Sequence, residues 1–167
     1  VAAVAPGSRP RNIIHLVADG MSSGTLTAAD YYSHFTRQRG LSWFDFAHRP
    51  GTHSASVNMR SLNSFVTDSS AASSSWGSGS RVMNGALNQL PDGRNLRTLY
   101  QLFDELHWRR GLVTTTEITH ATPAGFATNS ASRGSADELA VQYLDRRVDV
   151  LLGGGKPFFD AGKRKDK

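Results

Sequence analysis

An acidic residue and a serine stand at the head of a run of small side chains. Asp68 is followed by residues 69–75, which are serine and alanine only. A helix in a protein core carries bulky apolar residues at helical spacing, and this run carries none before Trp76. The small side chains therefore predict that another group approaches this backbone closely.

The position of Ser69 suits chemistry on an anion. It follows a short β-like segment, residues 64–66, and begins the helix that we predict next. The unpaired N–H groups and the dipole at a helix N-terminus attract anions such as phosphate. A hydroxyl at that point is placed to attack a phosphate, with Ser70 as the rival nucleophile. A serine-rich flexible linker is the competing interpretation of the run.

Predicted helices and strands alternate along the chain. We expect helices at residues 23–38, 97–108 and 137–147, and strands at residues 12–18, 111–116 and 148–152. The nearly continuous apolar run at 12–18 is typical of a buried central strand. The alternation predicts an α/β fold with a mainly parallel central sheet flanked by helices.

Three polar segments directly follow predicted strands. They are Asp19, the Asp68–Ser69 pair and residues 119–122. Because ligands of parallel sheets gather at the carboxyl ends of the strands, we expect these segments to converge on one edge of the sheet.

Composition excludes several other classes of function. The net charge of +5 invites a nucleic-acid partner, but all four lysines lie between Lys156 and Lys167, which leaves the body of the chain nearly neutral. No apolar run is long enough to span a membrane. The absence of cysteine excludes disulfides, thiolate zinc sites and a cysteine nucleophile.

Several motifs, in order, resemble those of the metal-dependent alkaline phosphatases. The main ones are D-G-M at 19–21, V-T-D-S at 66–69 and H-A-T-P at 120–123. Further matches are W-G-S-G at 76–79, N-G-A at 84–86 and D-V-L-L-G-G-G at 149–155. The resemblance extends over residues 11–159 and implies hydrolysis of phosphate monoesters.

The resemblance implies that two residues are catalytic and that a third orients one of them. Ser69 is the expected nucleophile, which forms a phosphoserine intermediate that water then hydrolyses. Arg133 is the expected phosphate clamp, because a planar guanidinium holds two phosphate oxygens at once. Asp68 is expected to orient Arg133 through a carboxylate–guanidinium contact, and also to cap the helix that follows it.

The resemblance also implies two zinc ions and a third metal, magnesium. Asp19 is expected to bridge one zinc and the magnesium, and Ser69 to contact zinc, which lowers the pKa of its hydroxyl. Thr122 and His120 are expected at the magnesium site. Because histidine suits zinc better than magnesium, His120 leaves two alternatives: it binds the metal directly, or it binds the metal's water.

This chain departs from the family pattern in two respects. Ser73 and Ser74 replace small residues of the family motif by other small residues. The family's remaining metal ligands come from later in the sequence than this chain extends. We therefore expect that the isolated chain is inactive and that a C-terminal segment of the same enzyme joins it as a second chain.

The resemblance and the composition also predict how the chain is divided into segments and where the protein is located. We expect an N-terminal extension at residues 1–10, the leading part of one alkaline-phosphatase-like domain at 11–159, and an exposed basic tail at 160–167 that is a candidate cleavage point. Family members imply a secreted or periplasmic enzyme and a homodimer. The alternatives are a related metal-dependent phosphodiesterase or sulfatase, or a non-catalytic, truncated phosphate-binding fragment.

Overall fold

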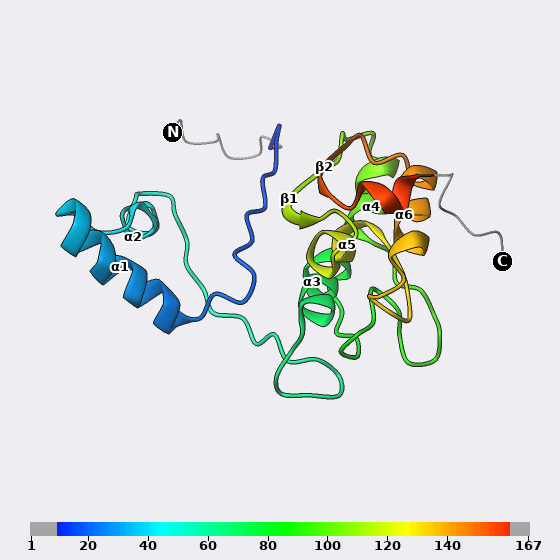
Figure 1. Ribbon diagram of the computed structural model, residues 1–167, viewed down its shortest axis with the longest axis horizontal. Helices are drawn as coiled ribbons and strands as arrows, with labels where there is room; N and C mark the ends of the chain where they lie inside the picture. The colour runs from blue at the N-terminus through cyan, green and yellow to red at the C-terminus, as the bar shows by residue number, and fades with distance from the viewer. Residues whose placement is uncertain (1–9, 161–167) are drawn as a thin grey trace. The chain divides into compact units, whose positions relative to one another are not determined.

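The computed structural model describes residues 10–160, which fall into two compact units (Figure 1). The first unit is Val1–Val57 and the second is Asn58–Lys167. The expected extension and basic tail lie outside the described residues, apart from residues 10 and 160. No helix within residues 10–160 is both long enough and apolar enough to cross a membrane.

The first unit contains the helices α1, Ser23–Arg37, and α2, Ser42–Ala47. Ser22 caps α1, because its hydroxyl accepts a hydrogen bond from the backbone N–H of Thr25 at 3.2 Å. The helix ends at Gln38, which adopts the left-handed conformation at φ 56°. The helix predicted at residues 23–38 is confirmed, with its C-cap at the last predicted residue.

The strand predicted at residues 12–18 is not formed. These residues have no strand hydrogen bonds, and their apolar side chains lie in the open, with Ile14 83% and Leu16 77% exposed. An apolar run becomes a strand only where a neighbouring strand pairs with it, and residues 10–57 contain no other strand. The β-like segment predicted at 64–66 is likewise not a strand.

The second unit combines two parallel strands with helices. Its elements are α3 (Ser69–Ser78), α4 (Leu99–Glu105), β1 (Gly111–Glu117), α5 (Ala121–Ala127), α6 (Ala136–Asp145), β2 (Val150–Gly154) and the 3₁₀ helix η1 (Lys156–Phe159). Strands β1 and β2 pair in parallel, with Leu112 opposite Leu151. The expected α/β class with parallel strands is confirmed, and so are the helices and strands predicted between residues 97 and 152, with ends shifted by a few residues.

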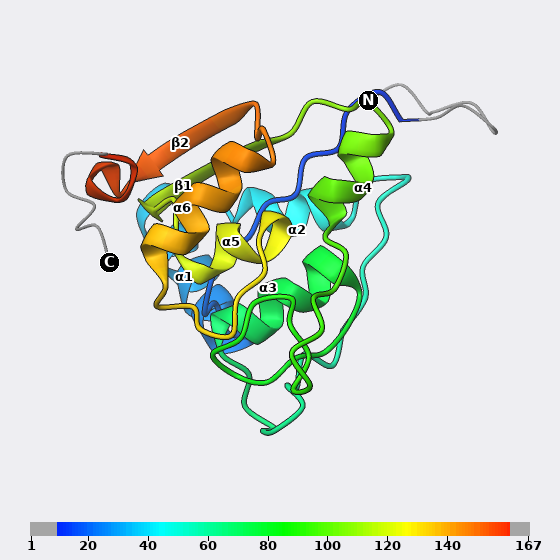
Figure 2. The same ribbon diagram turned by 90° about the vertical axis from the view of Figure 1, so that its right-hand side faces the viewer.

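Helix α5 occupies the centre of the second unit. Figures 1 and 2 both show it between the two strands and α3. The core residues around it are apolar and buried; they include Leu87, Leu112, Ile118, Phe126, Leu139 and Tyr143. The buried Tyr143 hydroxyl donates a hydrogen bond to the Ile118 carbonyl at 2.8 Å, which satisfies the polar end of this ring.

Helices α3 and α5 pack with their backbones in close approach. A Cβ atom added at Gly77 would overlap the carbonyl group of Gly125, and one added at Gly125 would overlap Ser73. The close approach predicted from the small side chains is therefore present. The group that approaches the later part of the run is helix α5.

Polar groups join the two helices where no bulky side chain fits. The Ser73 hydroxyl donates to the Ala121 carbonyl at 2.8 Å. The buried Asn88 amide donates to the Gly125 carbonyl at 2.6 Å, and its backbone N–H donates to the Ser74 hydroxyl at 2.9 Å. These bonds satisfy buried polar atoms that would otherwise destabilise so serine-rich a helix.

We expect Gly77→Ala to destabilise the protein by about 3 kcal/mol or more, because the added methyl group overlaps the backbone of α5. Urea unfolding followed by circular dichroism measures this loss. Gly24→Ala is the matched control: Gly24 also lies in a helix, and the nearest atom to an added Cβ is 3.6 Å away. A neutral Gly77→Ala would show that the two helices are not in close contact.

Candidate functional site

The carboxylate of Asp68 caps the first turn of α3. Asp68 holds the N-cap position in an extended conformation, and its Oδ1 accepts a hydrogen bond from the Ala71 N–H at 2.9 Å. An N-cap aspartate satisfies an otherwise unpaired N–H and complements the positive end of the helix dipole. Asp68 therefore starts the helix that carries Ser69.

Three other groups donate hydrogen bonds to the same carboxylate. The Ser70 hydroxyl lies 2.8 and 2.7 Å from its two oxygens. The Gly85 N–H donates to Oδ2 at 3.0 Å, and Arg133 Nη1 lies 3.2 Å from that oxygen. The contact expected between Asp68 and Arg133 is thus present, and it forms without breaking the helix cap.

The surroundings of Asp68 favour its charged form. Burial by itself raises the pKa of Asp68, but hydrogen bonds from the Ala71 N–H, Ser70, Arg133 and the Gly85 N–H together outweigh burial. The pKa of Asp68 consequently lies below its ordinary value of 3.8. At neutral pH the site therefore holds a carboxylate beside a guanidinium.

The structure distinguishes the two candidate serine nucleophiles. Ser70 is fully buried, and its hydroxyl both donates to Asp68 and accepts a hydrogen bond from the Gly85 N–H at 3.0 Å. Ser69 is the first residue of α3 and is only partly buried. Of the two serines, Ser69 is therefore the more exposed.

Arg133 joins two of the predicted site residues. Its Nη1 contacts Asp68, and its Nη2 lies 3.3 Å from Nε2 of His120. Because a guanidinium only donates hydrogen bonds, a neutral His120 accepts at Nε2 and carries its proton on Nδ1. The Arg133 side chain is 32% exposed, so it is held by the protein without being fully buried.

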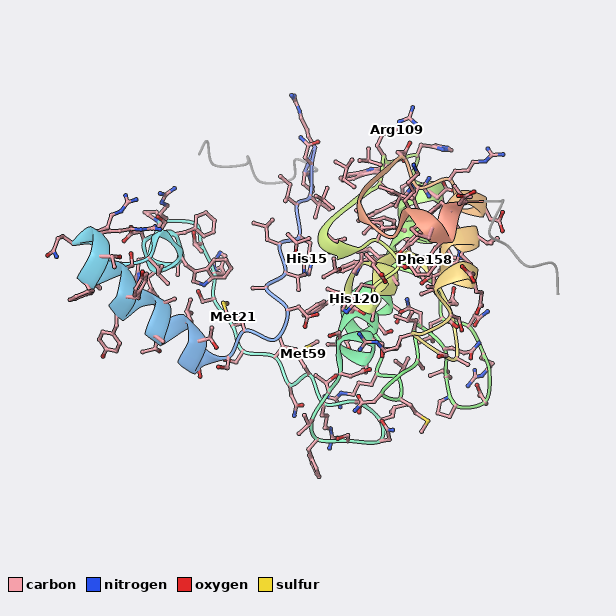
Figure 3. All side chains as sticks on the ribbon, in the orientation of Figure 1. His15, Met21, Met59, Arg109, His120 and Phe158 are labelled. Carbon is pink, nitrogen blue, oxygen red and sulfur yellow. The ribbon has the colours of Figure 1, made fainter. Side chains whose placement is uncertain are left out.

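His120 and Thr122 lie at the start of α5. His120 holds the N-cap position, and the partly buried Thr122 is the second residue of the helix. The hydrogen bond from Ser73 to Ala121 places this first turn beside α3, as the labelled His120 in Figure 3 illustrates. Asp68, Arg133, His120 and Thr122 therefore gather around two neighbouring helices.

Asp19 lies in the first unit. It is exposed in a turn closed by a hydrogen bond from the Met21 N–H to the Ala18 carbonyl at 3.3 Å, with Gly20 in the left-handed conformation. This conformation explains the glycine after the aspartate. Its convergence with the residues around Ser69, and its role as a metal ligand, stay predictions.

The site residues match metal ligands in kind but not in number. An imidazole, a hydroxyl and carboxylates are suitable donors for zinc and magnesium. Residues 10–160 contain no group of three or more histidine, aspartate or glutamate side chains arranged to hold a metal ion. A zinc site takes at least three protein ligands, so the described residues do not complete one.

Sequence reasoning missed the part that residues 84 and 85 play in this site. The Asn84 side chain accepts a hydrogen bond from the Asp68 N–H at 3.1 Å, and the Gly85 carbonyl accepts one from the Arg133 N–H at 2.7 Å. The Asn-Gly pair was a visible turn signal, but nothing in the sequence shows which segments that turn contacts.

Comparisons with known proteins agree with the motifs. The family model described as alkaline phosphatase matches residues 10–167. Alkaline phosphatase 3 of Bacillus subtilis is 34% identical to this chain over 164 residues, which is 94% of this chain and 34% of that protein. The chain thus spans about a third of the length of this curated relative.

Solved structures resemble the chain as well. The alkaline phosphatase of Thermus thermophilus superposes with a TM-score of 0.82 at 37% identity, over 90% of this chain and 31% of that one. A mutant of the TAB5 alkaline phosphatase, with glutamate in place of a histidine, is described as having Mg bound in its M3 site. It superposes with a TM-score of 0.70 at 26% identity, over 84% of this chain and 39% of that one.

We expect Asp68→Asn to lower the free energy of unfolding by about 1 kcal/mol at neutral pH, because asparagine keeps the cap but loses the charge that faces Arg133. A carboxylate with a lowered pKa stabilises the fold above its unfolded pKa and loses that effect as the pH falls through its folded pKa. The difference between wild type and variant should therefore shrink below about pH 4.

Urea unfolding of both proteins between neutral and acidic pH measures this difference. Asp92→Asn is the matched control, because Arg94 also lowers the pKa of Asp92, but at an exposed position where pairing contributes little. A difference between wild type and Asp68→Asn that stays constant with pH would contradict the assignment of charge to Asp68.

Proposed function

This chain belongs to the alkaline phosphatase family, and from that premise we propose that the protein hydrolyses phosphate monoesters with Ser69 as its nucleophile. The observation that carries the proposal is the Asp68–Arg133 ion pair, whose aspartate directly precedes the partly buried Ser69 at the start of α3. This arrangement combines a nucleophile, a helix N-terminus and a cationic group, which together suit a dianionic phosphate.

The proposed reaction has two steps. The Ser69 oxygen forms a bond to phosphorus as the ester oxygen of the leaving alcohol departs, and the serine proton ends on that alcohol. Water then attacks the phosphoserine, releases inorganic phosphate and restores the Ser69 hydroxyl. Each step displaces one oxygen at phosphorus by another, so no oxidant or reductant is needed.

Arg133 is the proposed clamp for the phosphate. A guanidinium carries five N–H donors, and among the described residues its side chain uses one toward Asp68 and one toward His120. The remaining donors can hold two terminal oxygens of a monoester phosphate. Asp68 keeps the guanidinium plane in place while the phosphate enters and leaves, which lowers the ordering cost of binding.

We propose that two zinc ions and a magnesium ion complete the site. When bound, zinc would lower the pKa of a coordinated hydroxyl and stabilise negative charge on phosphate oxygens. Asp19, Ser69, His120 and Thr122 are the proposed contributors from this chain. Because they do not complete a site, we propose that the missing ligands come from a C-terminal segment of the same enzyme, present as a second chain.

Location and assembly are proposed on the family alone. We infer a secreted or periplasmic enzyme whose complete form is a homodimer. Nucleic acid is not a proposed partner, because positive charge concentrates near the C-terminal end of the chain rather than along the described units.

We expect Ser69→Ala to abolish hydrolysis of an aryl phosphate by the full-length, metal-loaded protein, whereas Ser70→Ala keeps a phosphoserine at position 69. Peptide mapping by mass spectrometry after incubation with phosphate at acidic pH locates the phosphoserine. Ser70→Ala should destabilise the protein by about 1–2 kcal/mol, because it removes the buried hydroxyl that bonds to Asp68 and Gly85.

Two comparisons complete that experiment. The 167-residue chain alone should neither hydrolyse the ester nor trap phosphate, because the metal ligands that its described residues contribute do not complete a site. Aryl sulfate and an aryl phosphodiester should react far more slowly than the monoester. Aryl sulfate offers Arg133 a single negative charge where the monoester dianion offers two, and the diester has only two terminal oxygens and a single charge. Retained activity in Ser69→Ala would contradict the proposed nucleophile, and faster turnover of sulfate or diester would favour the related hydrolases.

We expect His120→Asp to raise the magnesium content of the full-length protein relative to zinc, because a carboxylate is a harder ligand than imidazole. When Nε2 of a neutral His120 accepts from Arg133, its other ring nitrogen carries a proton. That nitrogen can donate to a metal-bound water, which supports the alternative in which His120 acts through water. Elemental analysis of wild type and variant purified in parallel measures the two metals. An unchanged ratio of magnesium to zinc would place His120 away from the third metal.

A further inference from the structure

The turn at Asn84 and Gly85 contacts both halves of the candidate site. Asn84 contacts the backbone that leads into α3, and Gly85 contacts the Asp68 side chain and the Arg133 backbone. We propose that this Asn84–Gly85 turn is a positioning element, which sets where the nucleophile and the phosphate clamp lie relative to each other. The inference rests on the proposed function and adds two residues to its machinery.

Asn84 takes the place of a neighbouring strand for the segment before Ser69. Its Oδ1 accepts a hydrogen bond from the Asp68 N–H at 3.1 Å, and its Nδ2 donates to the Val66 carbonyl at 3.0 Å. One side-chain amide thus satisfies a donor and an acceptor on either side of Thr67, as a paired strand would. The backbone approach to Ser69 is thereby held although residues 64–66 belong to no strand.

Asn84 is itself held in place. Its backbone N–H donates to Oδ1 of Asn63 at 2.9 Å, and the Ser61 hydroxyl donates to the same oxygen at 3.0 Å. The backbone that carries the Asn84 amide is therefore held in place. A residue that positions another segment requires such support.

Gly85 connects Asp68 and Arg133 through its two backbone polar groups. Its N–H points at Oδ2 of Asp68 and Oγ of Ser70, each at 3.0 Å, and its carbonyl accepts the Arg133 N–H at 2.7 Å. A shift of this one peptide therefore displaces the carboxylate and the arginine backbone together. Displacements of about 1 Å are enough to slow an enzyme substantially.

Backbone conformation, and not space, accounts for glycine at position 85. Its φ is +89°, in the left-handed region, and an added Cβ would meet no atom within 4 Å. Gly93 has the same properties, with a φ of +85° and no atom within 4 Å, but neither its N–H nor its carbonyl contacts Asp68 or Arg133. The two glycines form a matched pair that separates backbone strain from positioning.

The test compares Gly85→Ala with Gly93→Ala in the full-length, metal-loaded protein. Both substitutions introduce the same kind of strain, so both should lower the melting temperature similarly. Only Gly85→Ala should weaken inhibition by inorganic phosphate, with a rise of about tenfold in its inhibition constant, because the clamp is displaced. Equal inhibition constants in the two variants would overturn the positioning role of Gly85.

Asn84→Ala provides a second variant should Gly85→Ala fail to fold. It should lower kcat/KM for an aryl phosphate about tenfold and change the phosphate inhibition constant less, because Asn84 holds the nucleophile's backbone rather than the arginine. A kcat/KM equal to that of Gly93→Ala would overturn the role of Asn84.

Activity of the wild type and of Ser69→Ala distinguishes a failure of the positioning proposal from a failure of the proposed function. If wild type is active and Ser69→Ala is not, a negative result with the turn variants contradicts only the positioning role. If wild type does not hydrolyse the ester, or Ser69→Ala retains activity, the proposed function fails and the inference fails with it.

Discussion

The close approach of α3 and α5 is the constraint on which the candidate site depends. Ser73, Gly77 and Gly125 leave no room between the two backbones for a larger side chain. Because the helices lie in contact, the residues at the start of α3 and those at the start of α5 are held near each other. Arg133 can therefore reach Asp68 with one nitrogen and His120 with another.

The serine content of α3 follows from the same constraint. A helix of larger apolar residues would gain more from burial, but it could not approach α5 as closely. Serine is small, and its hydroxyl also forms hydrogen bonds: that of Ser73 donates to the Ala121 carbonyl, and that of Ser74 accepts from the Asn88 N–H. The same short run of small residues thus allows the two helices to pack closely and also provides Ser69 for the proposed chemistry.

The Asp68 carboxylate is central to the candidate site. Asp68 accepts hydrogen bonds from α3, from the Asn84–Gly85 turn and from Arg133, so a single carboxylate connects three segments. The same hydrogen bonds keep its pKa low, so it remains a partner for the guanidinium at neutral pH. Positioning and electrostatics therefore act through the same contacts.

Local features were predictable from the sequence because neighbouring residues determine them. The helix from Ser23, the strand at β1 and the cap at Asp68 depend on periodicity and capping within a few positions. The motifs around Asp19, Ser69 and His120 also pointed to the family, which the comparisons confirm. The α/β class with parallel strands was thus predictable from the sequence, whereas the roles assigned to the residues of the candidate site stay predictions.

Contacts between distant residues were decided only by the tertiary structure. Whether residues 12–18 pair as a strand, and whether Ser69 or Ser70 remains accessible, depends on partners elsewhere in the chain. The same holds for the Asn84–Gly85 turn, whose bonds reach Val66, Asp68 and Arg133. Hydrogen bonds and close packing require particular atoms at particular distances, and a linear pattern of residue types does not contain those distances.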